Sequence, residues 1–384
     1  MKVKNFRWHV LFGGYAVTSL ALFLYSYTQV DLNLTLSKIT IWQSVQKFFQ
    51  HIGYFDRPLS TLIYLIILAS LFLLYGFLLR WVRAKHIERH NLWTLIFIVT
   101  AILVFSYPAF SYDIFNYLFA AKEVIVYHKN PYLVTPAQFA AVDPWILFMR
   151  WVHLPSAYTP LWIFLTLPAY LLGFGFFLPI LFLMKLLIAG SFLLCAWLIE
   201  KTLAVTDRDG SLMGLAIFAF NPLVLVEAVV SPHNDMLMMA AAIGAYYFYV
   251  RKQTVVAYFL WSISVALKLM TIVLLPLFFV GWKRLYAVLL MTIALLAVVS
   301  QREVLPWYLL WIIPFVALLP RSKALFTVTV GASLGLLLRY VPYLYLGNWD
   351  APADTWKWWL TLVPLGASIL LAVGKIVLLR RSLV

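Results

Sequence analysis

Residues 106–162 read SYPAFSYDIFNYLFAAKEVIVYHKNPYLVTPAQFAAVDPWILFMRWVHLPSAYTPLW, and they form the longest interruption in a sequence of apolar runs. Only 11% of the chain is charged. This stretch nevertheless carries the ionisable side chains Asp113, Glu123, His128, Asp143, Arg150 and His153. We interpret it as a loop outside the membrane that carries chemistry.

The composition around this loop is that of a membrane protein. The 384 residues are 64% hydrophobic and 17% aromatic, with a mean hydropathy of +0.93, whereas an ordinary soluble domain is roughly 45–50% apolar. Many apolar runs of about 15–25 residues have the length needed to cross a hydrocarbon core of ~30 Å. We therefore expect an all-α polytopic membrane protein. A single cysteine, Cys195, excludes a disulfide framework and a thiolate metal site.

The net charge of +15 would suggest a nucleic-acid partner in a soluble protein. Here the basic residues stand in short clusters beside apolar runs, as the positive-inside rule describes, so we expect no nucleic acid and a cytoplasmic place for these clusters. The clusters are Lys2/Lys4/Arg7, residues 80–89, Lys201/Arg208, Arg251/Lys252, Lys283/Arg284, Arg321/Lys323 and Arg380/Arg381. Both termini are then cytoplasmic. The first apolar run has no small-residue cleavage site after it and is interpreted as a retained helix.

These clusters predict about twelve membrane-spanning helices. The spans are expected near residues 8–27, 60–79, 91–107, 177–199, 211–227, 236–250, 254–268, 270–281, 283–300, 305–320, 324–345 and 358–379. The apolar run 158–173 would break the parity, and its prolines and following glycines favour a re-entrant element instead. We expect one integral membrane domain over 1–384, made of N-terminal helices (1–107), the outer loop (108–157), a central module (158–281) and C-terminal helices (282–384).

Two segments outside the spans have an amphipathic pattern. Residues 37–52 place their apolar side chains on one side and predict a helix at the membrane interface. Residues 143–153 predict a second one, with Asp143 as N-cap, Pro144 at the first helical position, and Trp145 and Phe148 in contact with lipid.

A helix over residues 112–127 would give the outer loop a polar edge. The 3.6-residue period places Asp113, Asn116, Ala120, Glu123 and Tyr127 on one stripe. Such a helix would lie on the membrane with this narrow edge facing a site. The plainer alternative is that Asp113 only caps the helix, and both interpretations can hold together.

The segment NPLVLVEAVVSPHND, residues 221–235, brings polar groups to the outer end of a span. His233, Asn234 and Asp235 form either an N-cap cluster or a substrate-binding edge, and a cap needs only one of them. Glu227 is expected in the headgroup zone.

Lys268 lies inside the apolar run VALKLMTIVLLPL. A cation in the middle of such a run costs roughly 2.5–3.5 kcal/mol on insertion scales, so either the lysine reaches the interface or an anion binds it. Arg302 and Arg339 fall at outer boundaries of later spans. Cations from three helices at one depth are what a phosphate headgroup requires. Lys185 has no role that the sequence assigns.

None of the common nucleotide-binding or metalloprotease motifs occurs. Asp113, His233 and Asp235 could ligate a divalent cation, but their spacing does not require one.

The ordered series SYD, NPY, YTPLW, NPLVLVEAVVSPHND and ALKLMTIVLLP resembles the polyprenyl-phosphate-mannose-dependent mannosyltransferases of the glycosyltransferase C superfamily. The resemblance runs over about residues 111–276. Within the superfamily, the chain is similar to bacterial alpha-1,6-mannosyltransferases and to the catalytic subunit of GPI mannosyltransferase I. PWYLLW at residues 306–311 fits the bacterial group. The series is specific for the superfamily and much less so for the sugar.

The resemblance implies a glycosyltransferase C-type fold and assigns roles to matching residues. Asp113 in SYD matches the catalytic acidic residue of the first long outer loop. Many members carry two acidic residues there, and Ser111 at the first position favours a lone base over a metal site. Lys268, with Arg302 and Arg339, would bind the donor phosphate. The remaining residues implied in sugar or acceptor binding are His233, Asn234, Asp235, Asn116, Glu123 and Tyr158.

The chemistry agrees with this layout. Inverting transfer needs a carboxylate to deprotonate the acceptor hydroxyl and fixed cations to stabilise the leaving phosphate. A nucleotide-sugar donor would need a cytoplasmic domain, and the inner loops are too short to form one. A transporter or flippase is the main alternative, and it would place ionisable groups near the bilayer midplane and show internal repeats. A non-catalytic scaffold would leave the outer polar residues unexplained. We expect a site on the extracytoplasmic face of a bacterial or archaeal plasma membrane, a polyprenyl-phosphate sugar donor and a glycan or glycolipid acceptor.

Overall fold

The computed structural model describes residues 2–381, with side chains from residue 8 to residue 375, and every regular element of the described chain is a helix or a 3-10 or π-turn. The basic residues Lys2, Lys4, Arg7, Arg380 and Arg381 therefore lie outside the described side chains. The helices of the first half are α1 (Lys2–Ser26), α2 (Thr40–Phe55), α3 (Arg57–Arg83), α4 (Arg89–Leu103), α5 (Asp113–Ile125), α6 (Pro160–Leu172) and α7 (Phe177–Thr206). Those of the second half are α8 (Ser211–Ala219), α9 (Pro222–Leu225), α10 (Asp235–Val250), α11 (Thr254–Leu267), α12 (Leu277–Val280), α13 (Arg284–Val299), α14 (Ile313–Ala317), α15 (Lys323–Leu338), α16 (Val341–Leu346) and α17 (Ala353–Arg381).

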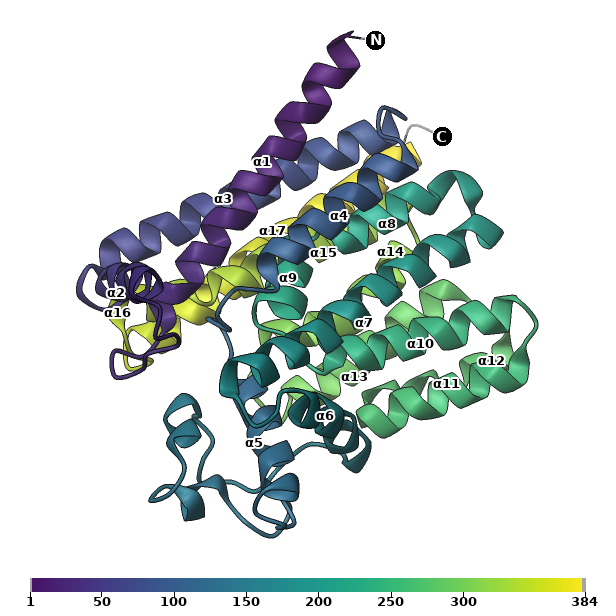
Figure 1. The fold of residues 1–384 in the computed structure, drawn as a ribbon. Helices are drawn as coiled ribbons and strands as arrows, with labels where there is room; N and C mark the ends of the chain where they lie inside the picture. Colours follow the sequence, from purple (N-terminus) through teal and green to yellow (C-terminus); the bar gives the residue numbers. More distant parts are fainter. Residues whose placement is uncertain (1, 382–384) are drawn as a thin grey trace.

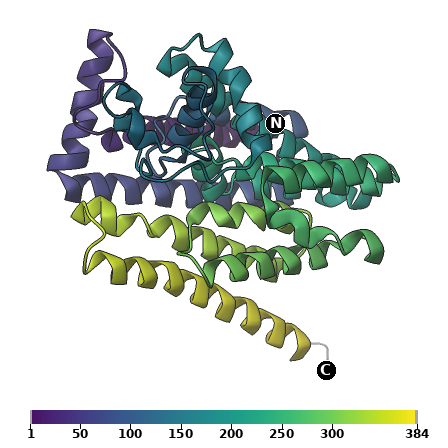
Figure 2. The same ribbon diagram turned by 90° about the horizontal axis from the view of Figure 1, so that it is seen from below.

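The helices lie side by side in one array whose two ends differ (Figure 1). Both termini are drawn at one end, and α5 is drawn at the other. α1 packs against α3 and α4, α7 against α8 and α10, and α10 against α11. α17 packs on α15 and forms one edge of the array in Figure 2. This arrangement separates the outer loop from the chain termini.

Five helical segments of the described chain are long and apolar enough to cross a membrane. They are Trp8–Gln29, Arg57–Arg83, Phe177–Thr206, Lys323–Leu346 and Ala353–Lys375. The pair Arg208–Ala219 and Pro222–Val230 adds a sixth if its 55° bend lies within one span. Seven further apolar helices have 10–17 residues, which is about 15–25 Å at 1.5 Å per residue. The chain is therefore an integral membrane protein by the length and composition of its helices.

Nearly every predicted span coincides with a helix, but several of the predicted helices are broken. The predicted span 211–227 divides into α8, α9 and the π-turn Val226–Val230, and the predicted span 324–345 divides into α15 and α16. Asn221 marks the first break, because its side chain accepts a hydrogen bond from the Leu223 backbone N–H (2.9 Å) and caps α9. Pro222 then stands at the first position of that helix, where a missing N–H is tolerated.

The prediction of an amphipathic helix near residues 37–52 is confirmed by α2. Two of its glutamines hold it against the preceding loop. The Gln46 side chain donates to the Leu34 carbonyl (2.6 Å) and the Gln50 side chain donates to the Asp31 carbonyl (2.8 Å). Its apolar Phe48 and Phe55 stay exposed, as expected of a helix that lies against lipid.

The prediction of a second amphipathic helix over residues 143–153 is wrong. Only one 3-10 turn, Pro144–Phe148, forms there, and Met149 is already extended. Asp143 does cap this turn through the Trp145 N–H (2.9 Å), but its carboxylate also binds Tyr127 and Lys122. Trp145 and Phe148 pack on Phe177 rather than on lipid. Interactions with the protein therefore decide the course of this segment.

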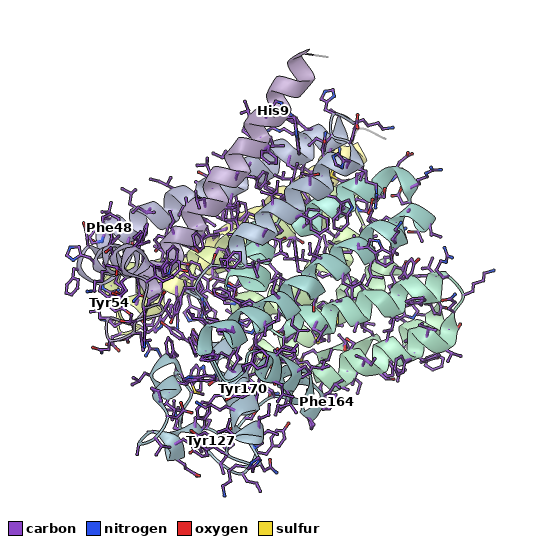
Figure 3. The ribbon with its side chains drawn as sticks, viewed as in Figure 1. His9, Phe48, Tyr54, Tyr127, Phe164 and Tyr170 are labelled. Atoms are coloured by element: carbon purple, nitrogen blue, oxygen red, sulfur yellow. The ribbon has the colours of Figure 1, made fainter. Side chains whose placement is uncertain are left out.

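Two ion pairs bring parts of the predicted basic clusters together. Arg89 pairs with Glu200 (2.5 Å) and Arg321 pairs with Asp207 (2.6 Å). Figure 3 shows His9 near the terminal end of the array, whereas the labelled aromatic residues Phe48, Tyr54, Tyr127 and Tyr170 lie in its other half. Aromatic residues also lie beside the basic clusters, since Lys201 lies over Trp197 and Lys283 lies over Tyr286.

Candidate active site

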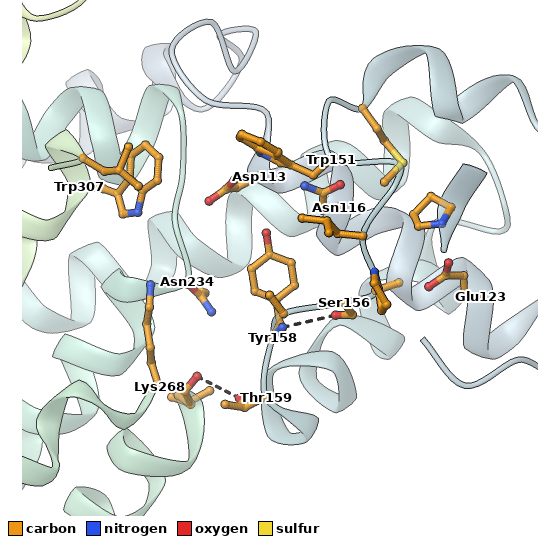
Figure 4. Close-up of a pocket in the computed structure, with 18 of the residues that line it drawn as sticks. Asp113, Asn116, Glu123, Trp151, Ser156, Tyr158, Thr159, Asn234, Lys268 and Trp307 are labelled. Carbon is orange, nitrogen blue, oxygen red and sulfur yellow. Dashed lines mark hydrogen bonds between the residues drawn. The ribbon is translucent and has the colours of Figure 1, made fainter. Parts of the chain in front are cut away.

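A cavity of about 380 Å³ opens at the outer end of the array, between α5, the loop before α6, the α11 terminus and the segment before residue 308 (Figure 4). Its wall contains polar side chains from parts of the sequence that are far apart. They are Asp113, Asn116, Glu123, Ser156, Tyr158, Thr159, Asn234, Lys268 and Arg302. Seven of the ten predicted site residues thus line one cavity.

α5 supplies one wall, and its polar stripe is confirmed. Asp113, Asn116, Ala120 and Glu123 all line the cavity. The apolar side chains on the opposite stripe, among them Ile114 and Leu118, are buried in the protein core. Tyr127, predicted on the same stripe, does not line the cavity and donates to Asp143 instead (2.9 Å). The stripe faces a site, while the rest of the helix is held by α6 and α7 rather than by lipid.

Asp113 does more than begin the helix. In the described part of the chain its carboxylate accepts no backbone hydrogen bond, so it does not act as a cap, and the Asp113 N–H donates to Ser111 Oγ (3.3 Å). The side chain is 18% exposed, toward the cavity. Burial raises the pKa of Asp113 to about 6, while nearby Lys268 lowers it and Asp235 raises it. A carboxylate whose pKa lies near the working pH is suited to act as a base.

Lys268 stands at a break between two helices. α11 ends at Leu267, and Lys268 adopts an extended conformation before the next 3-10 turn begins at Leu269. The carbonyl of Leu267 accepts a hydrogen bond from the hydroxyl of Thr159 (2.9 Å), which ties the break to the start of α6. The Nζ atom donates to both carboxylate oxygens of Asp235, at 2.7 and 2.8 Å. The lysine side chain remains 29% exposed and lines the cavity.

The three adjacent residues His233, Asn234 and Asp235 have three different positions. Asn234 lines the cavity, and its backbone N–H donates to the Tyr117 hydroxyl (3.3 Å). Asp235 is buried, and it accepts hydrogen bonds from Lys268 and from the Trp311 indole (2.5 Å). His233 is fully buried and does not line the cavity, because its ring stacks against Trp307 at 4.1 Å. Only Asn234 of the three faces the cavity space directly.

The two arginines predicted to bind phosphate, Arg302 and Arg339, also differ in whether they face the cavity. Arg302 is exposed, lines the cavity and takes part in none of the ion pairs among the described side chains. Arg339 is buried, does not line the cavity, and pairs with Glu303, which Lys357 also binds. Its guanidinium also lies over the Trp358 ring, 4.9 Å from the centroid. Two predicted phosphate ligands, Lys268 and Arg302, thus share the cavity, and the third is held elsewhere.

Glu123 lies nearly three turns along α5 from Asp113. Ten residues at 1.5 Å each separate the two by about 15 Å, which gives the length of the cavity along this helix. One carboxylate oxygen of Glu123 is buried with no hydrogen-bond partner in the described structure. Burial raises the pKa of Glu123 to about 7. Tyr158 lies between these ends, edge-on to the Tyr117 ring at 4.7 Å.

Two residues that the sequence left without a site role are resolved by their contacts. Glu227 is fully buried rather than in the headgroup zone, and the Tyr340 hydroxyl donates to it (2.9 Å). Lys185 is 1% exposed, and its Nζ donates to the carbonyls of Ser106 (2.6 Å) and Val230 (2.8 Å).

Sequence reasoning also missed several residues of the cavity wall. Ser156, Thr159 and Trp307 line it, although they lie in or beside the short motifs YTPLW and PWYLLW. The motifs could have indicated them, but composition alone could not. Among the described residues, no three His, Cys, Asp or Glu side chains are placed to hold a metal ion. Asp235, one of the suggested ligands, has both oxygens bound to Lys268.

The comparisons with known proteins identify the family of the chain. A family model described as alpha-(1→6)-mannopyranosyltransferase, N-terminal domain, matches residues 16–284 of the chain. No curated protein and no solved structure matches. The match spans most of the chain and includes α5, the His233–Asp235 segment and Lys268. The chain therefore belongs to the alpha-(1→6)-mannopyranosyltransferase family and is a polyprenyl-phosphate-mannose-dependent glycosyltransferase of the glycosyltransferase C superfamily.

Proposed function

We propose that the cavity transfers mannose, with inversion, from a polyprenyl-phosphate donor to an acceptor hydroxyl, and that Asp113 is the general base. The observation that carries this proposal is that one cavity wall holds a carboxylate with a raised pKa together with two cations, Lys268 and Arg302. Opposite charges are thus available at the two places where the reaction needs them.

In the reaction, the acceptor oxygen attacks the anomeric carbon while Asp113 takes its proton. The bond from that carbon to the phosphate oxygen breaks, and the electron pair leaves with the phosphate. Lys268 and Arg302 stabilise the charge that develops on this leaving group. Phosphate leaves well without protonation, so no general acid is needed. Lys268 keeps its orientation because Asp235 holds it from behind.

We infer that the acceptor glycan lies along α5, between Asp113 and Glu123. Asn116 and the unpartnered oxygen of Glu123 offer hydrogen-bond partners to sugar hydroxyls along that path, and Tyr158 and Trp151 offer aromatic surface. Asn234 lies close enough to the cavity to bind the mannosyl group. Arg339 is left out of this scheme, because its partner is Glu303.

We propose further that the shorter apolar helices also cross or enter the bilayer. About twelve spans then result, with α6 as a re-entrant element. The support is that α10 packs against the long α7 and that α11 packs against α10, so the short helices continue the array of long ones. The site would lie on the extracytoplasmic face of a bacterial or archaeal plasma membrane, opposite the basic clusters and the termini. We also propose that residues 1–384 form one membrane domain and that residues 108–157 are its catalytic loop.

The test is mannosyl transfer by the purified full-length protein in detergent, from polyprenyl-phosphate-mannose to an alpha-1,6-linked mannose disaccharide. Asp113→Asn keeps the size of the side chain and removes the base, so we expect kcat to fall about 10²–10⁴-fold. The exposed Asp354→Asn, at the start of α17, is the matched control and should transfer normally. Full transfer by a folded Asp113→Asn would move the base to another residue.

The pH dependence follows from the same carboxylate. Asp113 acts as a base only when ionised, and burial raises its pKa to about 6. Transfer should therefore be nearly constant above that pH and fall about tenfold per pH unit well below it. An acid limb near the ordinary pKa of an aspartate, about 3.9, would contradict the role of this buried group.

A further inference from the structure

Behind Asp113 lies a buried imidazole that the proposed transfer does not use. His233 is 0% exposed, and its Nε2 atom lies 3.8 Å from Asp113 Oδ2. Its other nitrogen, Nδ1, lies 3.1 Å from the backbone carbonyl oxygen of Glu227 and 3.6 Å from the Glu227 carboxylate. One ring thus stands between the candidate base and a second, fully buried acid.

The surroundings of the ring determine which nitrogen carries the proton. A carbonyl oxygen and a carboxylate oxygen both lie beside Nδ1, and a carbonyl can only accept, so Nδ1 carries the hydrogen. Burial lowers the pKa of His233 to about 4, so the ring is neutral near pH 7. A neutral ring with hydrogen on Nδ1 has a lone pair on Nε2. That Nε2 atom has no hydrogen-bond partner in the described structure.

The lone pair of Nε2 interacts differently with ionised Asp113 and with protonated Asp113. An ionised carboxylate facing it places two acceptors together, which is unfavourable. A protonated carboxyl can donate its O–H to Nε2, once the 3.8 Å separation shortens to hydrogen-bond distance. Such distances are often long in the absence of substrate and tighten in the reacting complex. The ring therefore favours the state of Asp113 that exists after it has taken a proton.

The ring cannot easily turn away from this arrangement. It stacks nearly parallel on Trp307, at 4.1 Å and 16°. The preceding turn is fixed by Ser231, whose Oγ accepts a hydrogen bond from the Phe110 N–H (2.9 Å). Tyr340 holds the Glu227 carboxylate by a hydrogen bond of 2.9 Å. The acceptor face of His233 is thus fixed from three sides.

We propose that His233 is a positioning residue that accepts a hydrogen bond from Asp113 once Asp113 has taken the proton of the acceptor hydroxyl. This inference rests on the proposed function of Asp113. The acceptor O–H bond breaks as the new glycosidic bond forms, the phosphate leaves with the electron pair of the old bond, and the proton passes to Asp113 Oδ2. The protonated Oδ2 then donates its hydrogen to Nε2 of His233.

Other titratable groups also face Asp113 and bear on its protonation. They are Tyr117, Tyr158, Glu227, Asp235, Lys268 and Tyr308. The His233 variants used below change none of them, so a shift that those variants cause in the pH profile is assigned to the imidazole.

The experiment measures kcat and the donor KM across pH for the full-length protein in detergent, with polyprenyl-phosphate-mannose and a mannose disaccharide. In His233→Leu the protonated form of Asp113 loses its hydrogen bond, so the pKa of Asp113 falls and it becomes a weaker base. We expect about tenfold lower kcat, an acid limb about one pH unit lower, and an unchanged donor KM. In His233→Gln the side-chain carbonyl can accept in place of Nε2, and much of the lost kcat should return.

Wild type and Asp113→Asn are measured in parallel to separate the two proposals. If the wild type transfers, Asp113→Asn does not, and His233→Leu keeps the wild-type kcat and acid limb, this inference fails while the function of Asp113 stands. If Asp113→Asn still transfers, both fail together. A purely structural role of His233 would lower stability and kcat without moving the acid limb, which also overturns the inference.

A variant outside the His233 side chain keeps the test decisive if His233→Leu does not fold. Glu227→Gln presents an amide N–H on the Nδ1 side, which favours the tautomer with hydrogen on Nε2. That hydrogen would donate to ionised Asp113 and lower its pKa. The acid limb should therefore shift to lower pH, by less than in His233→Leu because the Glu227 backbone carbonyl still binds Nδ1. An unmoved limb would count against the proposal.

Discussion

Lys185 and Lys268 look alike in the sequence, since each stands in an apolar run, but the protein uses them differently. Lys185 is 1% exposed in the middle of α7 and binds two backbone carbonyls, those of Ser106 and Val230. Lys268 lies at a helix break, binds the carboxylate of Asp235 and faces the cavity. The first joins two chain segments behind the site, and the second takes part in the site itself.

The difference teaches how to interpret a cation within an apolar run. Burying a charge requires partners, but the partners can come from the backbone as well as from a ligand. Lys185 has its partners within the protein and leaves nothing for a substrate. Lys268 keeps part of its side chain exposed after pairing with Asp235. Residual exposure into a cavity, rather than the presence of charge, identifies the site residue.

Of the variants that test the contrast between the two lysines, Lys268→Met should have the largest effect. The leaving phosphate loses a fixed cation, and we expect kcat to fall about 10²–10³-fold, as when one donor to a developing charge is removed. Because the variant also leaves Asp235 unpaired, Lys268→Met with Asp235→Asn is measured beside it. Recovery of kcat in the double variant would reduce Lys268 to a partner of Asp235. Recovery of thermal stability alone would support its action on the phosphate.

Lys185→Met should lower stability instead of chemistry. Two buried carbonyls lose their donor, and each unsatisfied group costs about 1–3 kcal/mol, partly offset because the lysine itself is no longer buried. We expect a net loss of about 2 kcal/mol in unfolding free energy, read as a lower melting temperature in detergent. Transfer per folded molecule should be retained. Lys201→Met, near the end of the same helix, is the control, and equal melting temperatures for the two variants would refute the structural role.

The same contrast shows what the sequence could and could not predict. Hydrophobic runs and basic clusters were enough to place the long apolar helices, because length and polarity decide what can lie in lipid. The 3.6-residue period placed Asp113, Asn116 and Glu123 on one wall correctly. The segment 143–153 was mispredicted, because the partners of Asp143 and Phe148 are distant in sequence.

For the same reason, the sequence could not show which side chains contact one another. His233, Asn234 and Asp235 are consecutive, yet one stacks under Trp307, one faces the cavity and one binds Lys268. A π-turn at Val226–Val230 and the break at Asn234 set these directions, and neither follows from hydropathy. Single residues at helix breaks therefore determine side-chain directions that hydrophobic periodicity does not predict.

Arg302→Gln should have a smaller effect than Lys268→Met, because Arg302 is exposed and water can replace part of its interaction. We expect kcat to fall about tenfold and the donor KM to rise, because Arg302 binds the donor phosphate and stabilises it as it leaves, and tenfold is the size of one charge-assisted hydrogen bond. The difference from wild type should shrink at high salt, where exposed charges are screened. Arg150→Gln, which lies outside the cavity wall and over Tyr112, is the matched control. A higher donor KM with an unchanged kcat would place Arg302 at ground-state binding instead of at the leaving group.

The smallest effect on transfer is expected for Arg339→Gln, although the sequence ranked Arg339 with Arg302 as a phosphate ligand. Arg339 is 3% exposed, and its guanidinium is engaged by Glu303 and by the ring of Trp358. Glu303 keeps Lys357 as a partner when the arginine is removed (2.5 Å), so no carboxylate is left unpaired. The donor KM should therefore stay close to wild type while the melting temperature falls modestly. A donor KM raised as much as in Arg302→Gln would show that Arg339 leaves Glu303 to bind the phosphate. The exposed fraction of a cation's side chain in the protein without substrate would then no longer distinguish site cations from structural ones.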